Sequence, residues 1–155
     1  MKNIILIFTV LIVALNTYAQ TDTPFDKAAF KDEKDGLKEA QKHLKMGDGY
    51  FFAVPFSDYK KAFESYENAY KFNPNNALLN FKMGICLINT NFRTRSLDYF
   101  EKAYKLNGSV SADIQYYLGQ SNQLNSKWDE AMNHYQQYKK NSYSNKEANP
   151  ELVST

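Results

Sequence analysis

Small and aromatic residues recur four positions apart, at a regular interval, along this chain of 155 residues. Successive pairs lie 34 and then 35 residues apart. They are Ala62 with Tyr66, Ser96 with Phe100, and Ala131 with Tyr135. A spacing of four places both members of a pair on one face of a helix. A fixed interval of this length indicates stacked copies of one unit, because a single copy cannot bury its own apolar face. The interval therefore predicts an all-α chain of repeated helix pairs.

A glycine stands twelve positions before the small residue in two of the copies, Gly84 before Ser96 and Gly119 before Ala131. Glycine at such a position allows the two helices of a pair to approach closely, because it has no side chain to separate them. Proline cannot continue a helix, so Pro74 marks the end of one copy. The pattern predicts three helix pairs, at about residues 43–76, 77–111 and 112–145.

A glycine, a small residue, an aromatic residue four positions later and a closing proline, repeated at about 34 residues, form the signature of the tetratricopeptide repeat (TPR). The chain resembles that family over about residues 43 to 145. The resemblance implies an all-α, right-handed helical solenoid of three helix-turn-helix repeats, in a domain that spans residues 33–141. A short segment, residues 20–32, would precede this domain, and a polar tail, residues 142–155, would follow it.

The stretch GDGYFFAVPFSDY, residues 47–59, is open to several interpretations. A phosphate-binding loop would need a lysine followed by serine or threonine, and a calcium loop would need acidic residues at alternating positions. Neither pattern is present, and a β-hairpin would break the register of the other copies. The register predicts instead a helix that begins near Asp32, continues with no insertion through Phe52, and ends before the proline. Tyr50 would then take the place that Gly84 has in the second pair.

The first residues resemble a secretory signal peptide. Lys2 gives a positive start, residues 4–15 form an apolar run, and Thr17 and Ala19 are the small residues that a signal peptidase reads. The run is shorter than the roughly 18 residues that span a bilayer as a helix; an uncleaved membrane anchor is the alternative. We expect residues 1–19 to be a signal peptide, with cleavage after Ala19, and the protein to be periplasmic, with outer-membrane association as a further option.

Charge and cysteine content give no sign of nucleic-acid binding or of disulfides. The formal net charge is +2, and cationic residues are interspersed with acidic ones. Cys86 is the only cysteine, so it cannot form an internal disulfide. His43 and His134 stand in different repeats, with no further ligand at metal-site spacing. The sequence predicts a non-catalytic protein with no metal, no cofactor and no nucleic-acid partner.

In TPR proteins the first helices of the repeats line a concave groove that binds ligands, and the resemblance assigns four groove positions to each repeat. They are Leu44, Gly47, Phe51 and Val54, then Leu78, Phe81, Ile85 and Ile88, then Asp113, Tyr116, Gln120 and Gln123. Spacings of three and four residues place each set on one helical face. A helix that is apolar all round is normally covered on all sides, so the middle helix predicts a partner in the groove.

One TPR sub-type binds a C-terminal carboxylate in this groove through basic and amide side chains. The corresponding positions here are Gly47, Phe51, Lys82, Asp113 and Tyr117, and only Lys82 is basic. This favours apolar or aromatic contact over carboxylate binding. Large apolar patches mark interfaces without naming the partner, and two alternatives remain open: the chain's own residues 21–30, or a second copy of the chain, covers the groove.

Residues 71–90 (KFNPNNALLNFKMGICLINT) and the repeat that follows also resemble the N-terminal TPR module of OmpA-like cell-envelope proteins, some of which serve type IX secretion or gliding. These 155 residues contain no counterpart of the residues that bind peptidoglycan in that family, so that activity is not carried over. The resemblance implies a protein-interaction module of the cell envelope that binds an envelope protein or peptide and contacts the membrane only indirectly. The alternative is an assembly subunit that forms a homodimer through the same groove.

Overall fold

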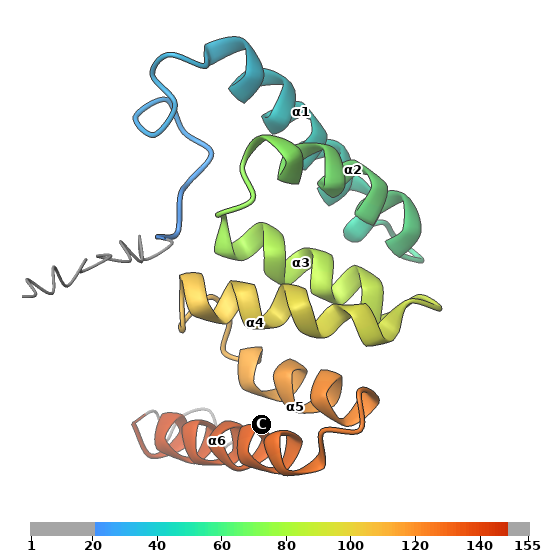
Figure 1. Cartoon of the computed structure of the whole chain (residues 1–155), viewed down its shortest axis with the longest axis vertical. Helices are drawn as coiled ribbons and strands as arrows, with labels where there is room; N and C mark the ends of the chain where they lie inside the picture. The colour runs from blue at the N-terminus through green and yellow to red at the C-terminus, as the bar shows by residue number, and fades with distance from the viewer. Residues whose placement is uncertain (1–20, 149–155) are drawn as a thin grey trace, which may run out of the picture.

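The computed structural model describes residues 21–148, and this part of the chain is all-helical, as the repeat pattern predicted (Figure 1). The elements are α1 (Lys34–Phe51), α2 (Tyr59–Phe72), α3 (Ala77–Ile88), the short 3-10 helix η1 (Arg93–Arg95), α4 (Ser96–Leu106), α5 (Ile114–Leu124) and α6 (Trp128–Ala148). The predicted signal peptide, residues 1–19, lies outside the described residues.

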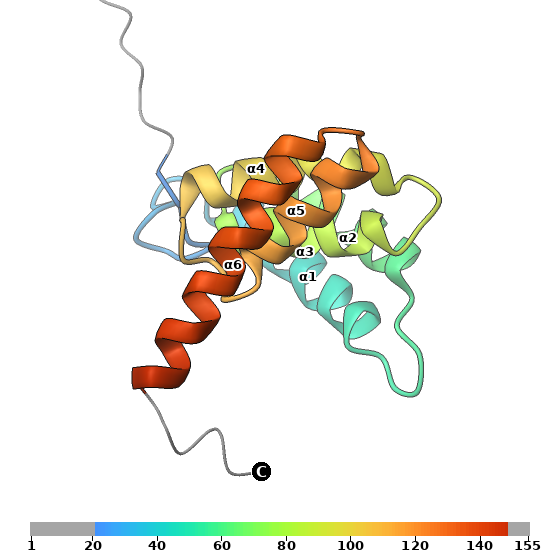
Figure 2. The same cartoon turned by 90° about the horizontal axis from the view of Figure 1, so that it is seen from below.

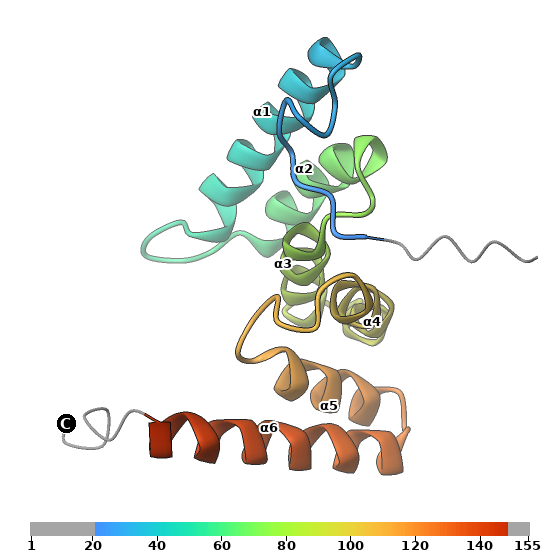
Figure 3. The ribbon, with the colours of Figure 1, turned by 90° about the vertical axis from the view of Figure 1, so that its left-hand side faces the viewer.

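Consecutive helices pack as three antiparallel hairpins, α1 with α2, α3 with α4, and α5 with α6. The hairpins stack in chain order, so that α2 contacts α3 and α4 contacts α5 (Figure 3). The three loops inside the hairpins lie at one end of the stack, on the right in Figure 1, and the described N-terminal segment lies at the other end.

Side-chain caps and a proline define several helix ends. Asp58 begins α2, because its Oδ1 accepts a hydrogen bond from the backbone N–H of Lys61 at 3.0 Å. Asn76 begins α3 in the same way and accepts from Leu79 at 2.8 Å. Helix α2 ends at Phe72, just before the Asn-Pro pair, as the proline predicted.

Glycines on the first helix of each hairpin face an aromatic ring on the second. A β-carbon at Gly84 would come within 2.6 Å of the Phe100 ring, and one at Gly119 within 2.6 Å of the Tyr135 ring. No real β-carbon makes so short a contact, so only glycine fits at these two crossings. Phe100 is fully buried there. The predicted role of both glycines is confirmed.

The first hairpin uses Gly47 for this purpose, so the predicted register of the first repeat is wrong. Gly47 lies against the ring of Tyr66, as Gly84 lies against Phe100. However, Gly47 precedes Tyr66 by 19 residues, whereas the two other glycines precede their rings by 16. Three additional residues therefore lie between the glycine and its ring in the first hairpin. The loops over residues 52–58 and 89–95 are equally long, so the additional residues belong to α2, which begins seven residues before Tyr66, whereas α4 begins four residues before Phe100. Tyr50 does not take the place of Gly84, and α1 ends at Phe51.

The N-terminal segment binds the turn between α2 and α3. The backbone N–H of Thr23 donates to the carbonyl oxygen of Asn75 at 2.8 Å, and the Thr23 carbonyl accepts from the Asn73 side chain at 2.9 Å. Asp22 accepts a hydrogen bond from the backbone N–H of Ala77 at 2.8 Å, and so adds a second cap to α3. These bonds join segments that are some fifty residues apart in the sequence.

Aromatic contacts hold the rest of this segment to the end of α2. The rings of Phe25 and Phe30 lie 6.4 Å and 4.7 Å from the ring of Phe72, measured between centroids. The segment thus covers the α2–α3 turn and not the predicted groove residues of α3 and α5. The alternative that residues 21–30 cover the groove is wrong, because the carbonyls and rings at the end of α2 bind the segment instead.

Helix α6 is longer than the repeat pattern predicted and extends past the main stack (Figure 2). It continues to Ala148, so residues 142–148 of the predicted polar tail are helical. The sequence from Asn141 to Ala148 has neither glycine nor proline, and Pro150 is the first breaker. The predicted boundary between the helical domain and the tail, at residue 141, is therefore wrong, because a polar composition does not by itself end a helix.

Candidate functional site

The predicted groove residues lie on α1, α3 and α5, with one exception. Helix α1 carries Leu44, Gly47 and Phe51; α3 carries Leu78, Phe81, Lys82, Ile85 and Ile88; and α5 carries Tyr116, Tyr117, Gln120 and Gln123, with Asp113 just before it. Val54 belongs to the loop after α1 and is exposed, so it does not share a helical face with Phe51. Its assignment to the groove followed from the incorrect register.

Touching aromatic rings connect α3 with α5. Phe81 lies edge-on to Tyr117, with centroids 5.6 Å apart, and Tyr117 lies edge-on to Tyr116 at 5.4 Å. Tyr117 also stacks on the buried ring of Phe100 at 5.2 Å. Burial raises the pKa of the Tyr117 hydroxyl, and the charge of Asp113 raises it further. We call Phe81, Tyr117 and Tyr116 the aromatic run; it passes from the core to the surface.

Tyr116 is the exposed end of the aromatic run, with 40 % of its surface open to solvent. Its ring contacts Tyr135 and Tyr138 of α6, at 6.1 Å and 5.7 Å between centroids. The hydroxyl of Tyr135 donates to Gln123 at 2.9 Å, and that of Tyr138 donates to Asp113 at 3.2 Å. Two predicted groove residues, Gln123 and Asp113, are thus bonded to the final helix, which fixes the surroundings of Tyr116.

Phe51 belongs to a second group of rings. Its centroid lies 4.9 Å from that of Phe52, 5.8 Å from that of Tyr59 and 6.1 Å from that of Tyr66. Phe51 and Tyr59 pack against the buried cluster that includes Ile85. Ile85 is only 8 % exposed, so it is a core residue and is not available to a partner in this arrangement, contrary to its predicted place in the groove.

Lys82, the one basic residue predicted in the groove, is paired within the chain. Its Nζ lies 2.7 Å from Oδ1 of Asp48 on α1, and the hydroxyl of Tyr66 donates to the same oxygen at 2.5 Å. The Lys82 ammonium also lies 5.5 Å from the centroid of the Phe52 ring. Burial raises the pKa of the Tyr66 hydroxyl, and the hydrogen bond to Asp48 raises it further. The carboxylate of Asp48 therefore compensates the charge of Lys82.

Sequence reasoning missed Asp48 and Phe52 as members of this site. The sequence pattern suggests Asp48 only as a calcium ligand, and Phe52 only as a helical residue. Asp48 follows Gly47 as Ile85 follows Gly84, but this correspondence can be recognised only once Gly47, and not Tyr50, is known to lie at the helix crossing. A charged residue on α1 thus takes the position that an aliphatic core residue has on α3, and Lys82 of α3 is its partner.

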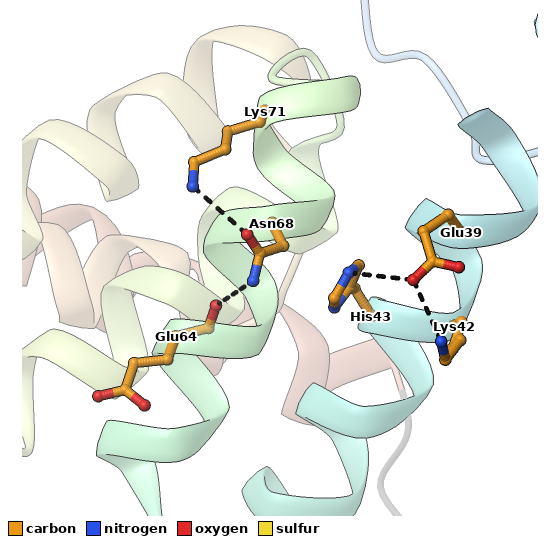
Figure 4. A network of polar contacts seen from close by, with 6 residues as sticks. All are labelled: Glu39, Lys42, His43, Glu64, Asn68 and Lys71. Atoms are coloured by element: carbon orange, nitrogen blue, oxygen red, sulfur yellow. Dashed lines mark hydrogen bonds and ion pairs between the residues drawn. The ribbon is translucent and has the colours of Figure 1, made fainter.

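Short networks of polar contacts lie on the two helices of the first hairpin (Figure 4). On α1, Glu39 lies 3.2 Å from Lys42 and 3.5 Å from His43, measured between charged atoms. On α2, the side chain of Asn68 joins Lys71 to the backbone of the preceding turn. These i to i+3 and i to i+4 pairs are typical of solvated helix surfaces and contribute a few tenths of a kcal/mol each.

The remaining titratable groups that the sequence singled out lie apart from one another. Nδ1 of His134 on α6 is hydrogen-bonded to Oε1 of Gln115 on α5 at 2.7 Å, whereas His43 lies on α1. Burial raises the pKa of the Cys86 thiol to about 12. Within residues 21–148, no group of three or more His, Cys, Asp or Glu side chains is arranged to hold a metal ion.

The arrangement can therefore bind through aromatic faces and apolar contact around Tyr116 and Phe52, with an internally compensated ion pair beside Phe52. No helix among the described residues is both long enough and apolar enough to cross a bilayer. No protein-family model matches the chain, and comparison with curated proteins gives no significant match.

Proposed function

We propose that the chain is a non-catalytic protein-interaction module that binds a protein or peptide partner through the aromatic run. The observation that carries the proposal is the exposed ring of Tyr116, which continues inward through Tyr117 to Phe81. Exposed aromatic residues that rest on a rigid core are the usual anchors of protein interfaces, and truncating one often costs about 2 kcal/mol or more. The hydroxyls of tyrosine also retain hydrogen bonds at such a boundary.

We further propose that the three hairpins are TPR-like repeats in a right-handed solenoid, and that the protein acts in the cell envelope after export to the periplasm. The regular spacing of the small, glycine and aromatic residues supports the repeat assignment. The apolar N-terminal run supports export. The partner in this proposal is an envelope protein, and any contact of the aromatic run with a membrane is indirect.

The chemistry of the partner follows from the ion pair next to the run. Lys82 is the one basic residue that the sequence placed in the groove. Because the Asp48 carboxylate neutralises its charge, Lys82 is not free to bind the C-terminal carboxylate of a partner. An apolar or aromatic side chain of the partner, packed on Tyr116 or on Leu78, which is exposed one turn before Phe81 on α3, fits this surface better. Such contacts depend little on salt, whereas carboxylate binding by a free cation would weaken as salt rises.

Site-specific photo-crosslinking tests the proposal. A photoreactive phenylalanine replaces Tyr116 in one variant and Tyr104 of α4 in a matched control, since the two tyrosines are 40 % and 39 % exposed. Irradiation in the envelope fraction of the producing cells should give a discrete adduct with a foreign protein at position 116 and none at position 104. Excess unlabelled wild-type protein should compete for the adduct, and a Tyr116→Ser, Leu78→Ser variant should not.

The same experiment distinguishes the self-association alternative. Adducts of twice the chain mass, and a wild-type mass in light scattering that falls on Tyr116→Ser substitution, would assign the surface to a homodimer. Equal foreign adducts at positions 116 and 104 would overturn the proposal, because the aromatic run would then have no special part in binding.

A further inference from the structure

A different surface of the molecule, at the loop end of the stack, carries a second set of exposed apolar side chains. The loops that join α1 to α2, α3 to α4 and α5 to α6 all lie on the right of Figure 1, away from the N-terminal segment. We define the loop edge as the loops over residues 52–58, 89–95 and 125–127, together with Trp128, the first residue of α6. It is separate from the aromatic run, which lies within the helices.

A large apolar residue is exposed to solvent within two of the three loops and directly after the third, where Trp128 begins α6. Phe56 is 85 % exposed, Phe92 is 61 % exposed and Trp128 is 62 % exposed, and Val54 beside Phe56 is exposed as well. Isolated exposed apolar residues are ordinary, but here one lies in or directly after every loop at the same end of the molecule. Their arrangement on three separate projections differs from the contiguous, well-packed centre of a protein interface.

Cationic residues accompany these apolar tips. Arg93 and Arg95 follow Phe92 closely, and Lys127 precedes Trp128. The one acid in the three loops, Asp58, already caps α2 and lies 3.1 Å from Lys61. The first turns of the following helices add Lys60 and Lys61 on one side, and Asp98, Asp129 and Glu130 on the other. The loops themselves therefore carry an excess of positive charge beside their aromatic residues.

A small apolar cavity lies behind the central loop. Its volume is about 140 Å³, its walls include Phe63, Leu87 and Phe92, and Lys60 and Arg95 also line it, together with Glu64. An apolar cavity whose lining includes two cations and one acid has a net positive charge, which suits a ligand that is part hydrocarbon and part anion. Phospholipids combine these two properties.

We propose that the loop edge docks on the surface of a phospholipid bilayer that contains anionic lipids. Phe56, Phe92 and Trp128 enter the boundary between headgroups and acyl chains, where aromatic side chains are favoured. Arg93, Arg95 and Lys127 remain at the level of the phosphates. A bilayer is deformable and can receive three separate tips at once, whereas a protein partner would need a matching hollow for each.

Trp128 is the only tryptophan of the chain, so its fluorescence reports on the loop edge alone. The full-length protein, purified in the form that cells accumulate, is mixed with vesicles of phosphatidylethanolamine and phosphatidylglycerol whose acyl chains carry bromine. Bromine quenches tryptophan only within the bilayer boundary. We expect quenching and a blue shift of the emission, with much weaker effects on vesicles of phosphatidylcholine.

Two variants and a matched control complete the test. Phe56→Ser with Phe92→Ser should raise the lipid concentration for half-maximal quenching at least about tenfold, because each buried aromatic ring contributes on the order of 1–2 kcal/mol. Arg93→Gln with Arg95→Gln should raise it on anionic vesicles but not on phosphatidylcholine. Tyr104→Ser, at the opposite end of α4, should leave it unchanged. Circular dichroism checks that every variant keeps its helix content.

The wild-type protein and all of the variants have the same N-terminal residues. Any membrane attachment through those residues is therefore common to all of them and cannot cause a difference in Trp128 quenching between them. Absence of Trp128 quenching on anionic vesicles would overturn the proposal, as would quenching that is equal in wild type and in the Phe56, Phe92 variant. A photoreactive residue at position 56 that forms adducts with a protein and not with lipid would also overturn it, and would assign the loop edge to a protein partner.

Discussion

Gly47 on α1 lies so close to the ring of Tyr66 on α2 that a β-carbon at position 47 would overlap the ring. Tyr66 is fully buried, and its hydroxyl donates to Asp48, the residue next to Gly47. The ring is therefore held between the glycine that it covers and the carboxylate that it binds. This contact sets the distance between the two helices of the first hairpin and positions Asp48 for its ion pair with Lys82.

Gly47→Ala should destabilise the protein by roughly 1–3 kcal/mol, because the added methyl group must displace a buried ring. Gly49→Ala is the matched control on the same helix. A β-carbon at Gly49 meets nothing within 4 Å, so this substitution should be neutral or stabilise the helix by up to about 1 kcal/mol. Urea unfolding followed by circular dichroism measures both. Equal effects of the two substitutions would contradict the assigned crossing point.

Asp48 and Lys82 should show a coupling free energy of about 1 kcal/mol in a double-mutant cycle with Asp48→Asn and Lys82→Met. The Lys82 side chain is mostly buried, whereas Asp48 is partly solvated, which moderates the value. Raising the salt concentration should reduce the coupling only slightly, since the pair is close and partly shielded from solvent. A coupling indistinguishable from zero would show that the two residues do not stabilise one another in solution.

The free energy of unfolding should fall as the pH is lowered through the ordinary histidine pKa of 6.5. Burial lowers the pKa of His134 in the folded protein, although the charges of Glu101 and Glu130 oppose this. The unfolded chain therefore binds the proton more tightly than the folded chain, and protonation favours unfolding. Thermal unfolding at pH 8, 7, 6 and 5 measures the slope. His134→Gln should reduce it, and an unchanged slope in that variant would exclude His134 as its origin.

Export should leave a protein whose N-terminus is Gln20. The short apolar run and the small residues at positions 17 and 19 are the basis for this expectation. Mass spectrometry of the protein from a periplasmic fraction identifies the first residue directly. Recovery of a chain that still begins with Met1 from the membrane fraction would favour an uncleaved anchor instead.

The sequence by itself determined that the described part of the chain is helical and that Pro74 follows the end of a helix. Caps and breakers act between residues close together along the chain, and the four-residue spacing of Ala62 and Tyr66 follows from the geometry of a single helix. The aromatic run was also largely predictable, because Phe81, Tyr116 and Tyr117 belong to helices whose register the repeats set correctly.

Only the tertiary structure decided the features that depend on contacts between distant segments. The pairing of Asp48 with Lys82 spans 34 residues, and the hydrogen bond from Ala77 to Asp22 spans 55. Nothing local to either partner indicates such a contact. The three additional residues in the first hairpin could not be predicted from the sequence either. A glycine can stand in a helix wherever close packing requires it. Only the position of the Tyr66 ring shows that Gly47, rather than Tyr50, lies at the crossing of the two helices.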